Sequence, residues 1–194
     1  MTLKETIIHE SLKLFSLKGF LSTSIGDILE ATKASKGGFY NHFKSKEDLF
    51  YNVLAEARRI WRERNLKGLD PDGDPVLKLN QFLLNFRDRY LKDSENFPGG
   101  CIFITLLVEL KNQKPHLADE INKGFNGLKK MLNRYLSEAQ EQGKLRADKD
   151  AGALTEMIFN SILGITITYN ANKSGGDADK AIDIMIEFLH QLEN

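Results

Sequence analysis

Apolar residues recur at every third or fourth position along most of the chain, and this spacing constrains the fold more than any other feature. The series Ile8, Leu12 and Phe15 shows it near the start. A longer series runs through Ile121, Phe125, Leu128, Leu132 and Leu136. The alternation with a period of two that a half-buried strand requires is almost missing from the sequence. The pattern predicts an all-α protein with about nine helices.

Proline, glycine and capping residues divide the pattern into helices. We expect the helices at residues 3–18, 24–31, 35–42, 46–66, 75–93, 101–112, 116–142, 150–171 and 177–192. The strongest break is the turn-rich segment from Gly68 to Pro75. It predicts a small N-terminal domain at residues 1–50, a linking helix at 46–66, and a larger helical body at 67–194.

The second and third predicted helices are too short to be stable without tertiary packing. Between them only Lys33 and Ala34 remain for a turn, which is the short connection of a helix-turn-helix. Phe39 and Phe43 fall on one face of the third helix, where they can pack on the first helix. These features predict a compact three-helix head whose third helix enters the major groove of DNA.

Three serines are placed to begin helices in this head. They are Ser24 with Asp27, Ser35, and Ser45 with Asp48. Lys33, Lys36, Lys44 and Lys46 surround the third helix with no acidic residue before Glu47. Because 27 basic residues balance 27 acidic ones in the whole chain, any affinity for DNA must come from this local patch. Helix N-termini also attract phosphate, so we expect Thr23, Ser24 and Lys46 to clamp the DNA backbone.

The segment SKGGFYNHFKSKEDLF at residues 35–50, preceded by TSIGDI at 23–28, resembles the DNA-binding signature of TetR-family repressors. The resemblance covers residues 6–50, and the rest of the chain agrees in length and helical layout. It implies phosphate contacts from Thr23, Tyr40, His42 and Lys46, and groove contacts from Ser35, Lys36, Gly37, Gly38 and Asn41. Gly38 departs from the pattern, because the family usually carries a small side chain there.

Dimerisation is expected because a single helix-turn-helix makes too few base contacts for useful specificity. The resemblance implies that the last two long helices pair with those of a second copy on a palindromic operator. The candidate interface residues are Ile158, Ile162, Ile165, Ile182, Met185, Ile186 and Leu189. The alternative is that these residues form the core of their own chain.

The middle of the chain carries aromatic residues and the one cysteine. An effector pocket, implied by the resemblance, could use Phe82, Phe86, Phe103 and Phe125, although core packing is the favoured explanation for each of them taken singly. Cys101 lies at a predicted helix N-terminus, where a thiol pKa is lowered. Its Gly-Cys segment resembles a subset of the family that senses electrophiles or oxidants. The alternative is a small buried residue at a tight turn.

Several other classes of protein are disfavoured by the sequence. A single cysteine excludes an intrachain disulfide and suits a reducing compartment. Met1–His9 lacks a signal-like apolar run, and no segment approaches the ~18 apolar residues of a membrane span. The four histidines are scattered, and no phosphate-binding glycine loop occurs. We therefore expect a cytoplasmic protein without membrane contact, metal, cofactor or enzymatic activity.

The resulting hypothesis is a homodimeric DNA-binding transcriptional regulator. It predicts a repressor that leaves a palindromic operator of double-stranded DNA when a small-molecule or electrophilic effector binds. One alternative is an effector-independent DNA-binding structural or interaction protein. Another is a helical enzyme in which the head is only a packing unit.

Overall fold

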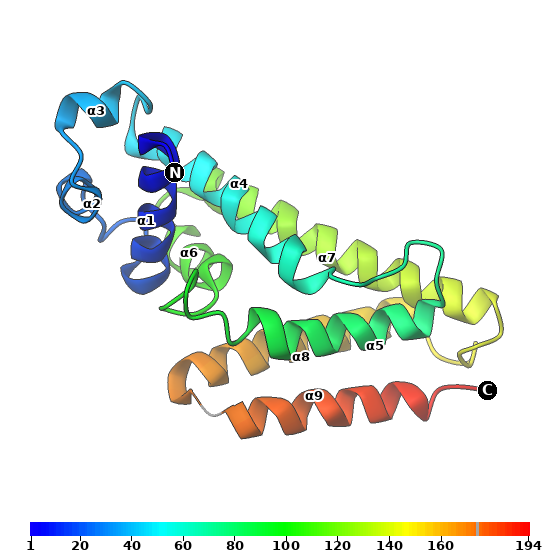
Figure 1. The fold of residues 1–194 in the computed structure, drawn as a ribbon. Helices are drawn as coiled ribbons and strands as arrows, with labels where there is room; N and C mark the ends of the chain where they lie inside the picture. Colours follow the sequence, from blue (N-terminus) through cyan, green and yellow to red (C-terminus); the bar gives the residue numbers. More distant parts are fainter. Residues whose placement is uncertain (174) are drawn as a thin grey trace. The chain divides into compact units, whose positions relative to one another are not determined.

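The computed structural model describes residues 1–173 and 175–194. The helices are α1 (Leu3–Lys18), α2 (Ile25–Thr32), α3 (Lys36–Tyr40), α4 (Lys46–Asn65), α5 (Pro75–Asn85), the π-helical turn η1 (Phe86–Tyr90), α6 (Ile102–Leu110), α7 (Pro115–Glu141), α8 (Ala151–Asn172) and α9 (Gly175–His190) (Figure 1). Within the described ranges the only extended pairing is an isolated bridge between Leu145 and Glu193. The prediction of an all-α fold is confirmed.

The chain packs into two compact units. Unit 1 comprises Met1–Trp61 and Asp93–Asn122, and unit 2 comprises Arg62–Lys92 and Lys123–Asn194. Packing therefore groups α6 with the three-helix head, although α6 lies far from it in sequence. The predicted domains, with boundaries at residues 50 and 67, stay a prediction.

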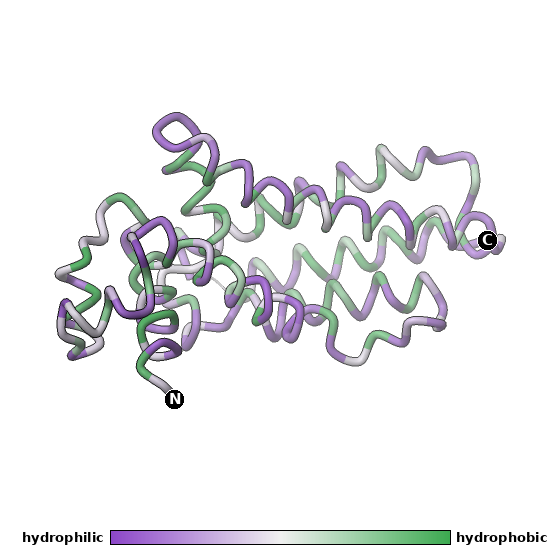
Figure 2. Tube along the Cα trace, turned by 90° about the horizontal axis from the view of Figure 1, so that it is seen from above, coloured by the Kyte–Doolittle hydropathy of each residue, from purple (hydrophilic) through white to green (hydrophobic). Residues whose placement is uncertain are grey.

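Unit 1 is built on the apolar faces of its short helices. Leu12, Phe15, Ile28 and Phe39 are fully buried. In α1 the fully buried isoleucine is Ile7, whereas the predicted Ile8 is half-buried. Burying such side chains stabilises the fold by about 1.5–3 kcal/mol each, which offsets the poor intrinsic stability of α2 and α3. Apolar and polar segments alternate along the helices (Figure 2).

Local capping explains why the helices of the head begin where they do. The Ser24 hydroxyl accepts the Asp27 N–H and the Asp27 carboxylate accepts the Ser24 N–H, so the predicted capping box of α2 is confirmed. Ser35 caps α3 by accepting the Gly38 N–H at 3.0 Å. Ser45 accepts the Asp48 N–H, but the Asp48 carboxylate takes the N–H of Lys44 instead of that of Ser45.

Unit 2 has its own apolar core, to which α5, α8 and α9 contribute. Leu79 and Phe82 of α5, Ile158 of α8, and Ile182 and Leu189 of α9 are fully buried. The expectation that no segment approaches a membrane span is wrong by length and composition, because α8 could cross a membrane on those two grounds. The core helix of a soluble protein passes the same test, and Ile158, Phe159 and Ile162 are buried within the protein.

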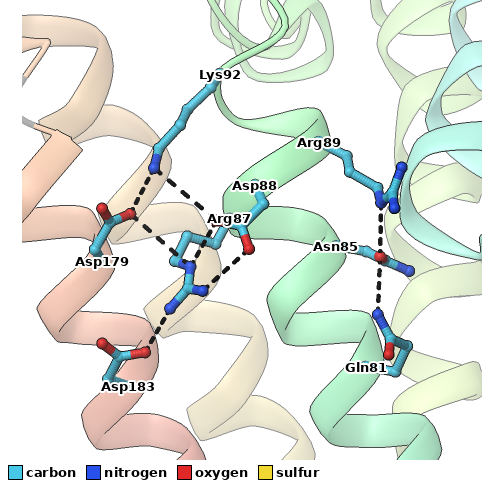
Figure 3. Close-up of polar contacts among 8 residues, drawn as sticks. All are labelled: Gln81, Asn85, Arg87, Asp88, Arg89, Lys92, Asp179 and Asp183. Carbon is cyan, nitrogen blue, oxygen red and sulfur yellow. Dashed lines mark hydrogen bonds and ion pairs between the residues drawn. The ribbon is translucent and has the colours of Figure 1, made fainter.

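The π-helical turn η1 carries a charged cluster that joins it to α9 (Figure 3). The Leu91 N–H donates to the Phe86 carbonyl at 2.8 Å, which is an i to i+5 bond. The Arg87 guanidinium donates to Asp88 and to Asp183 of α9, and Lys92 donates to Asp179 of α9 at 2.8 Å. The hydrogen-bonded guanidinium lowers the pKa of Asp88.

Candidate nucleic-acid interface

The turn between α2 and α3 has the geometry of a helix-turn-helix. Lys33 ends α2 in the left-handed conformation at φ 53° and ψ 28°. The Ala34 N–H donates back to the Leu29 carbonyl at 3.1 Å, which satisfies the end of α2. A lysine in this conformation costs about 1–2 kcal/mol relative to glycine, so the turn is maintained by the packing of the two helices.

The face of α3 predicted to read DNA is open to solvent. Ser35, Lys36, Gly37, Tyr40, Asn41 and His42 are exposed, and Gly38 is half-buried. Phe39 and Phe43 lie behind this face and are buried, with ring centroids 5.5 Å apart. The prediction that these two phenylalanines hold the recognition helix is confirmed, and the polar side chains on the other face are left to contact a ligand.

Gly38 has little room for a larger side chain. A Cβ at this position would lie 3.3 Å from Leu3 Cδ2 and 3.3 Å from Ser35 Oγ. These are tight distances to flexible side chains, so an alanine requires only a small adjustment. Steric hindrance at position 38 is therefore too weak to exclude the small residues that are usual in the family.

The N-terminus of α2 is capped by Ser24 and carries a carboxylate, Asp27, whose pKa is lowered. Ser24 is exposed, whereas Thr23 is fully buried and its hydroxyl donates to the Gly19 carbonyl at 2.6 Å. Hydrogen bonds from the backbone and side chain of Ser24, with Lys18 at 3.1 Å, lower the pKa of Asp27 to about 2. The Thr23 hydroxyl is therefore engaged within the turn, and the Ser24 and Asp27 N–H groups are engaged within the capping box.

Lys46, at the start of α4, is engaged with the turn between α1 and α2. Its Nζ donates to the carbonyls of Phe20 at 2.9 Å and Thr23 at 2.8 Å, and lies 4.4 Å from the centroid of the Phe20 ring. Partial burial lowers the pKa of this ammonium. An ammonium has three N–H donors, and two of them hold the turn.

Two carboxylates beside Lys46 were not singled out by the sequence patterns. Glu47 binds Lys114 at 2.5 Å and His116 at 3.1 Å, and these hydrogen bonds lower its pKa. Glu109 of α6 accepts backbone N–H groups of the turn that Lys46 also holds. The contacts join residues more than sixty positions apart in the sequence, so no local motif could have predicted them.

The residues predicted for an effector pocket or sensor lie in both units. Phe82 and Phe86 are buried in unit 2 and Phe103 is buried in unit 1. Phe125 is half-buried and meets Phe159 edge-on at 5.7 Å. Cys101 is half-buried, not in a disulfide, and occupies the N-cap position of α6.

Most of the predicted dimer residues lie in the core of their own unit. Ile158, Ile162, Ile182, Met185 and Leu189 are buried, and Ile165 and Ile186 are half-buried. The exposed apolar side chains of α8 and α9 are instead Met157, Ile167 and Ile184. Among the described residues, no three His, Cys, Asp or Glu side chains are grouped to hold a metal ion.

The helix-turn-helix and its exposed polar face define a DNA-binding protein. Residues 7–53 match the family of bacterial regulatory proteins, tetR family, and residues 75–185 match the tetracyclin repressor-like, C-terminal domain. The chain therefore belongs to the TetR family and is a DNA-binding transcriptional regulator.

Similar proteins span both halves of the chain. It is 54% identical over 195 residues to the HTH-type transcriptional regulator YerO of Bacillus subtilis, covering 97% of this chain and 64% of YerO. It is 38% identical over 181 residues to the HTH-type transcriptional regulator QacR of Staphylococcus aureus, covering 89% of each. A crystal structure of a TetR transcriptional regulator from Chloroflexus aurantiacus has a TM-score of 0.89 and 25% identity, covering 98% of this chain and 96% of that one. These relatives are regulators, in agreement with the expectation that the protein is not an enzyme.

Proposed function

We propose that the protein is a cytoplasmic, homodimeric repressor that binds a palindromic operator and leaves it when a small-molecule or electrophilic effector binds. The observation that carries this proposal is the exposed face of α3. Its polar residues point outward while Phe39 and Phe43 fix the helix from behind. A dimer presents two such faces, and each reads one half-site of a palindrome.

The operator is tested by selecting bound duplexes from a random DNA pool with the native protein. We expect a palindrome whose half-sites are one helical turn apart or a multiple of it. A selected sequence without two-fold symmetry would contradict dimeric reading. Failure to retain any DNA at low salt, where phosphate contacts are strongest, would contradict the interface itself.

Individual contacts are tested on the selected duplex with a matched pair of tyrosine variants. Tyr40 is 46% exposed beside the recognition face, and Tyr51 on α4 is 44% exposed. We expect Tyr40→Phe to weaken binding about tenfold or more, because a hydrogen bond to a charged phosphate is lost at each half-site. Tyr51→Phe is the control and is expected to bind like the native protein. Equal DNA affinities for the two variants would contradict a contact between the Tyr40 hydroxyl and DNA.

We infer that the dimer surface uses the outer sides of α8 and α9. Ile167 is 54% exposed and Ile184 is 64% exposed, and apolar side chains so placed favour burial against a second copy. Both Ile167→Glu and Ile184→Glu are expected to shift sedimentation toward the monomer. Leu77→Glu on α5, at a side chain that is 66% exposed, is the control. A dimer that persists in both isoleucine variants would refute this surface.

For the effector, the position of Cys101 at the N-cap of α6 supports a reactive thiol that is alkylated by electrophiles. Native protein is treated with N-ethylmaleimide and its mass and operator affinity are measured. We expect one adduct at Cys101 and a loss of operator binding that Cys101→Ser escapes. An unmodified Cys101, or an adduct that leaves operator binding intact, would refute the sensor role. In that event an apolar ligand beside half-buried Phe125 remains the proposal for the effector.

A further inference from the structure

The turn between α1 and α2 is held from two sides by ionised side chains of unit 1. On one side the Glu109 carboxylate accepts the Phe20 N–H at 2.7 Å and the Leu21 N–H at 3.0 Å. On the other side Lys46 donates to the carbonyls of Phe20 and Thr23. Hydrogen bonds with an ionised partner are shorter and roughly twice as strong as neutral ones. The turn is therefore more tightly specified than an ordinary surface turn.

Gly19 makes the approach of Glu109 possible. It ends α1 at φ 81°, in a region that favours glycine, and a Cβ there would lie 2.4 Å from Glu109 Oε1. The carboxylate thus occupies the space where any other residue would place its side chain. Glycine at position 19 therefore meets two requirements of this turn, the positive φ and the space for the Glu109 carboxylate.

The other end of α6 is also fixed to α1. The Ser16 hydroxyl, which is buried, accepts the Gly99 N–H at 3.0 Å and donates to the Gly100 carbonyl at 3.0 Å. The Gly99 backbone lies so close that a Cβ there would be 2.0 Å from the Ser16 carbonyl oxygen. The α6 helix is therefore connected to α1 through Ser16 at its N-terminal side and to the turn through Glu109 at its C-terminal side.

The turn leads directly into the N-terminus of α2. Thr23 closes it through the hydrogen bond from its hydroxyl to Gly19, and Ser24 caps α2 in the next position. We propose that Glu109 is a positioning residue for operator binding, which sets the place of the α2 N-terminus through the backbone of the turn. The proposal depends on DNA binding by α2 and α3, but not on the identity of the effector.

The sign of one substitution separates positioning from simple electrostatics. Replacing a carboxylate by an amide removes a negative charge, which by itself strengthens binding to DNA. Glu95→Gln, at an exposed residue before α6, gives this baseline. Glu109→Gln makes the same charge change but turns an NH₂ group toward one of the two N–H donors. We expect it to weaken binding to the selected duplex about tenfold. The slope of log association constant against log salt concentration is expected to become less steep by about 0.9, the value of one phosphate contact.

Hydrogen exchange of the free protein tests the contact without DNA. In Glu109→Gln the amides of Phe20 and Leu21 are expected to exchange faster than in the native protein, while the amides of buried α8 residues stay protected. Glu109→Ala is expected to increase the exchange further. Unchanged exchange at both amides, or a Glu109→Gln affinity that rises as in Glu95→Gln, would overturn the proposal. If neither the native protein nor Glu95→Gln binds DNA, the DNA-binding assignment itself is contradicted.

Discussion

Gly99→Ala is the substitution for which the structure gives the clearest physical expectation. The new Cβ would lie 2.0 Å from the Ser16 carbonyl oxygen, 2.4 Å from its carbon and 2.7 Å from the Leu17 Cα. All three atoms belong to the backbone of α1, so no side chain can rotate away. The two segments must separate by about 1.4 Å to reach ordinary van der Waals contact at 3.4 Å.

The magnitude follows from the contacts that this separation disturbs. Overpacking in a well-packed region costs about 1–3 kcal/mol. The hydrogen bonds of Ser16 with Gly99 and Gly100 are each worth about 0.5–1.5 kcal/mol and are stretched at the same time. We expect the free energy of unfolding to fall by about 3 kcal/mol. With a urea m-value of about 1–3 kcal/mol/M, the midpoint falls by about 1–3 M.

The assay is urea unfolding followed by circular dichroism at one fixed protein concentration, because dimerisation makes the midpoint depend on concentration. The control is Gly127→Ala on α7, where a Cβ would meet nothing within 4 Å among the described residues. This control is expected to raise the free energy of unfolding by about 0.5–1 kcal/mol, since alanine favours a helix over glycine. A Gly99→Ala midpoint equal to or above the native one would refute the reasoning from backbone contact.

Three further predictions concern single residues. Relieving the left-handed backbone in Lys33→Gly gains about 1–2 kcal/mol, and the greater entropy of glycine in the unfolded chain costs about 0.5–1 kcal/mol, so the free energy of unfolding is expected to rise by about 1 kcal/mol at most. The lost charge is expected to weaken DNA binding, and a lower urea midpoint would contradict the first expectation. Because the pKa of Asp27 is lowered from 3.8 to about 2 in the folded state, its contribution to stability is present above pH 4 and lost as the pH falls toward 2. The difference in urea midpoint between native protein and Asp27→Asn is expected to shrink over that range, and a constant difference would argue against the assignment. Asn85 is buried and its amide donates to the Asn65 and Lys67 carbonyls, so Asn85→Ala is expected to cost about 2–4 kcal/mol in urea unfolding, against little change for exposed Asn126→Ala.

Features written in short stretches of sequence were predictable. The capping serines Ser24 and Ser35 begin their helices as expected, since a cap depends on residues three positions away. The buried faces of Phe39 and Phe43 follow from helical spacing alone. The position of the recognition head in the chain could therefore be predicted from local sequence patterns alone.

Features that depend on long-range packing were not predictable in this way. Glu109 reads as an ordinary polar residue of α6 until the fold places it against a turn 88 residues earlier in the chain. Periodicity also identified the apolar stripes of α8 and α9 without deciding what covers them. Ile158 and Ile182 face the core of their own unit, whereas Ile184 remains exposed. A helix contains both kinds of position, and only the packed structure separates them.

The π-helical turn at Phe86–Tyr90 means that the packing of unit 2 depends on the number of residues in this segment as well as on their types. Its i to i+5 hydrogen bond accommodates one residue more than an α-helical ladder would, so Tyr90 and Leu91 at the end of the segment are displaced by about 100° around the helix axis. Deleting exposed Asp88 would restore an α-helical ladder and turn buried Tyr90 and Leu91 off the core. In this segment a relative that differs by one residue in length must therefore differ in helix type as well. A gap in an alignment here marks a change of helical register rather than a shortened loop.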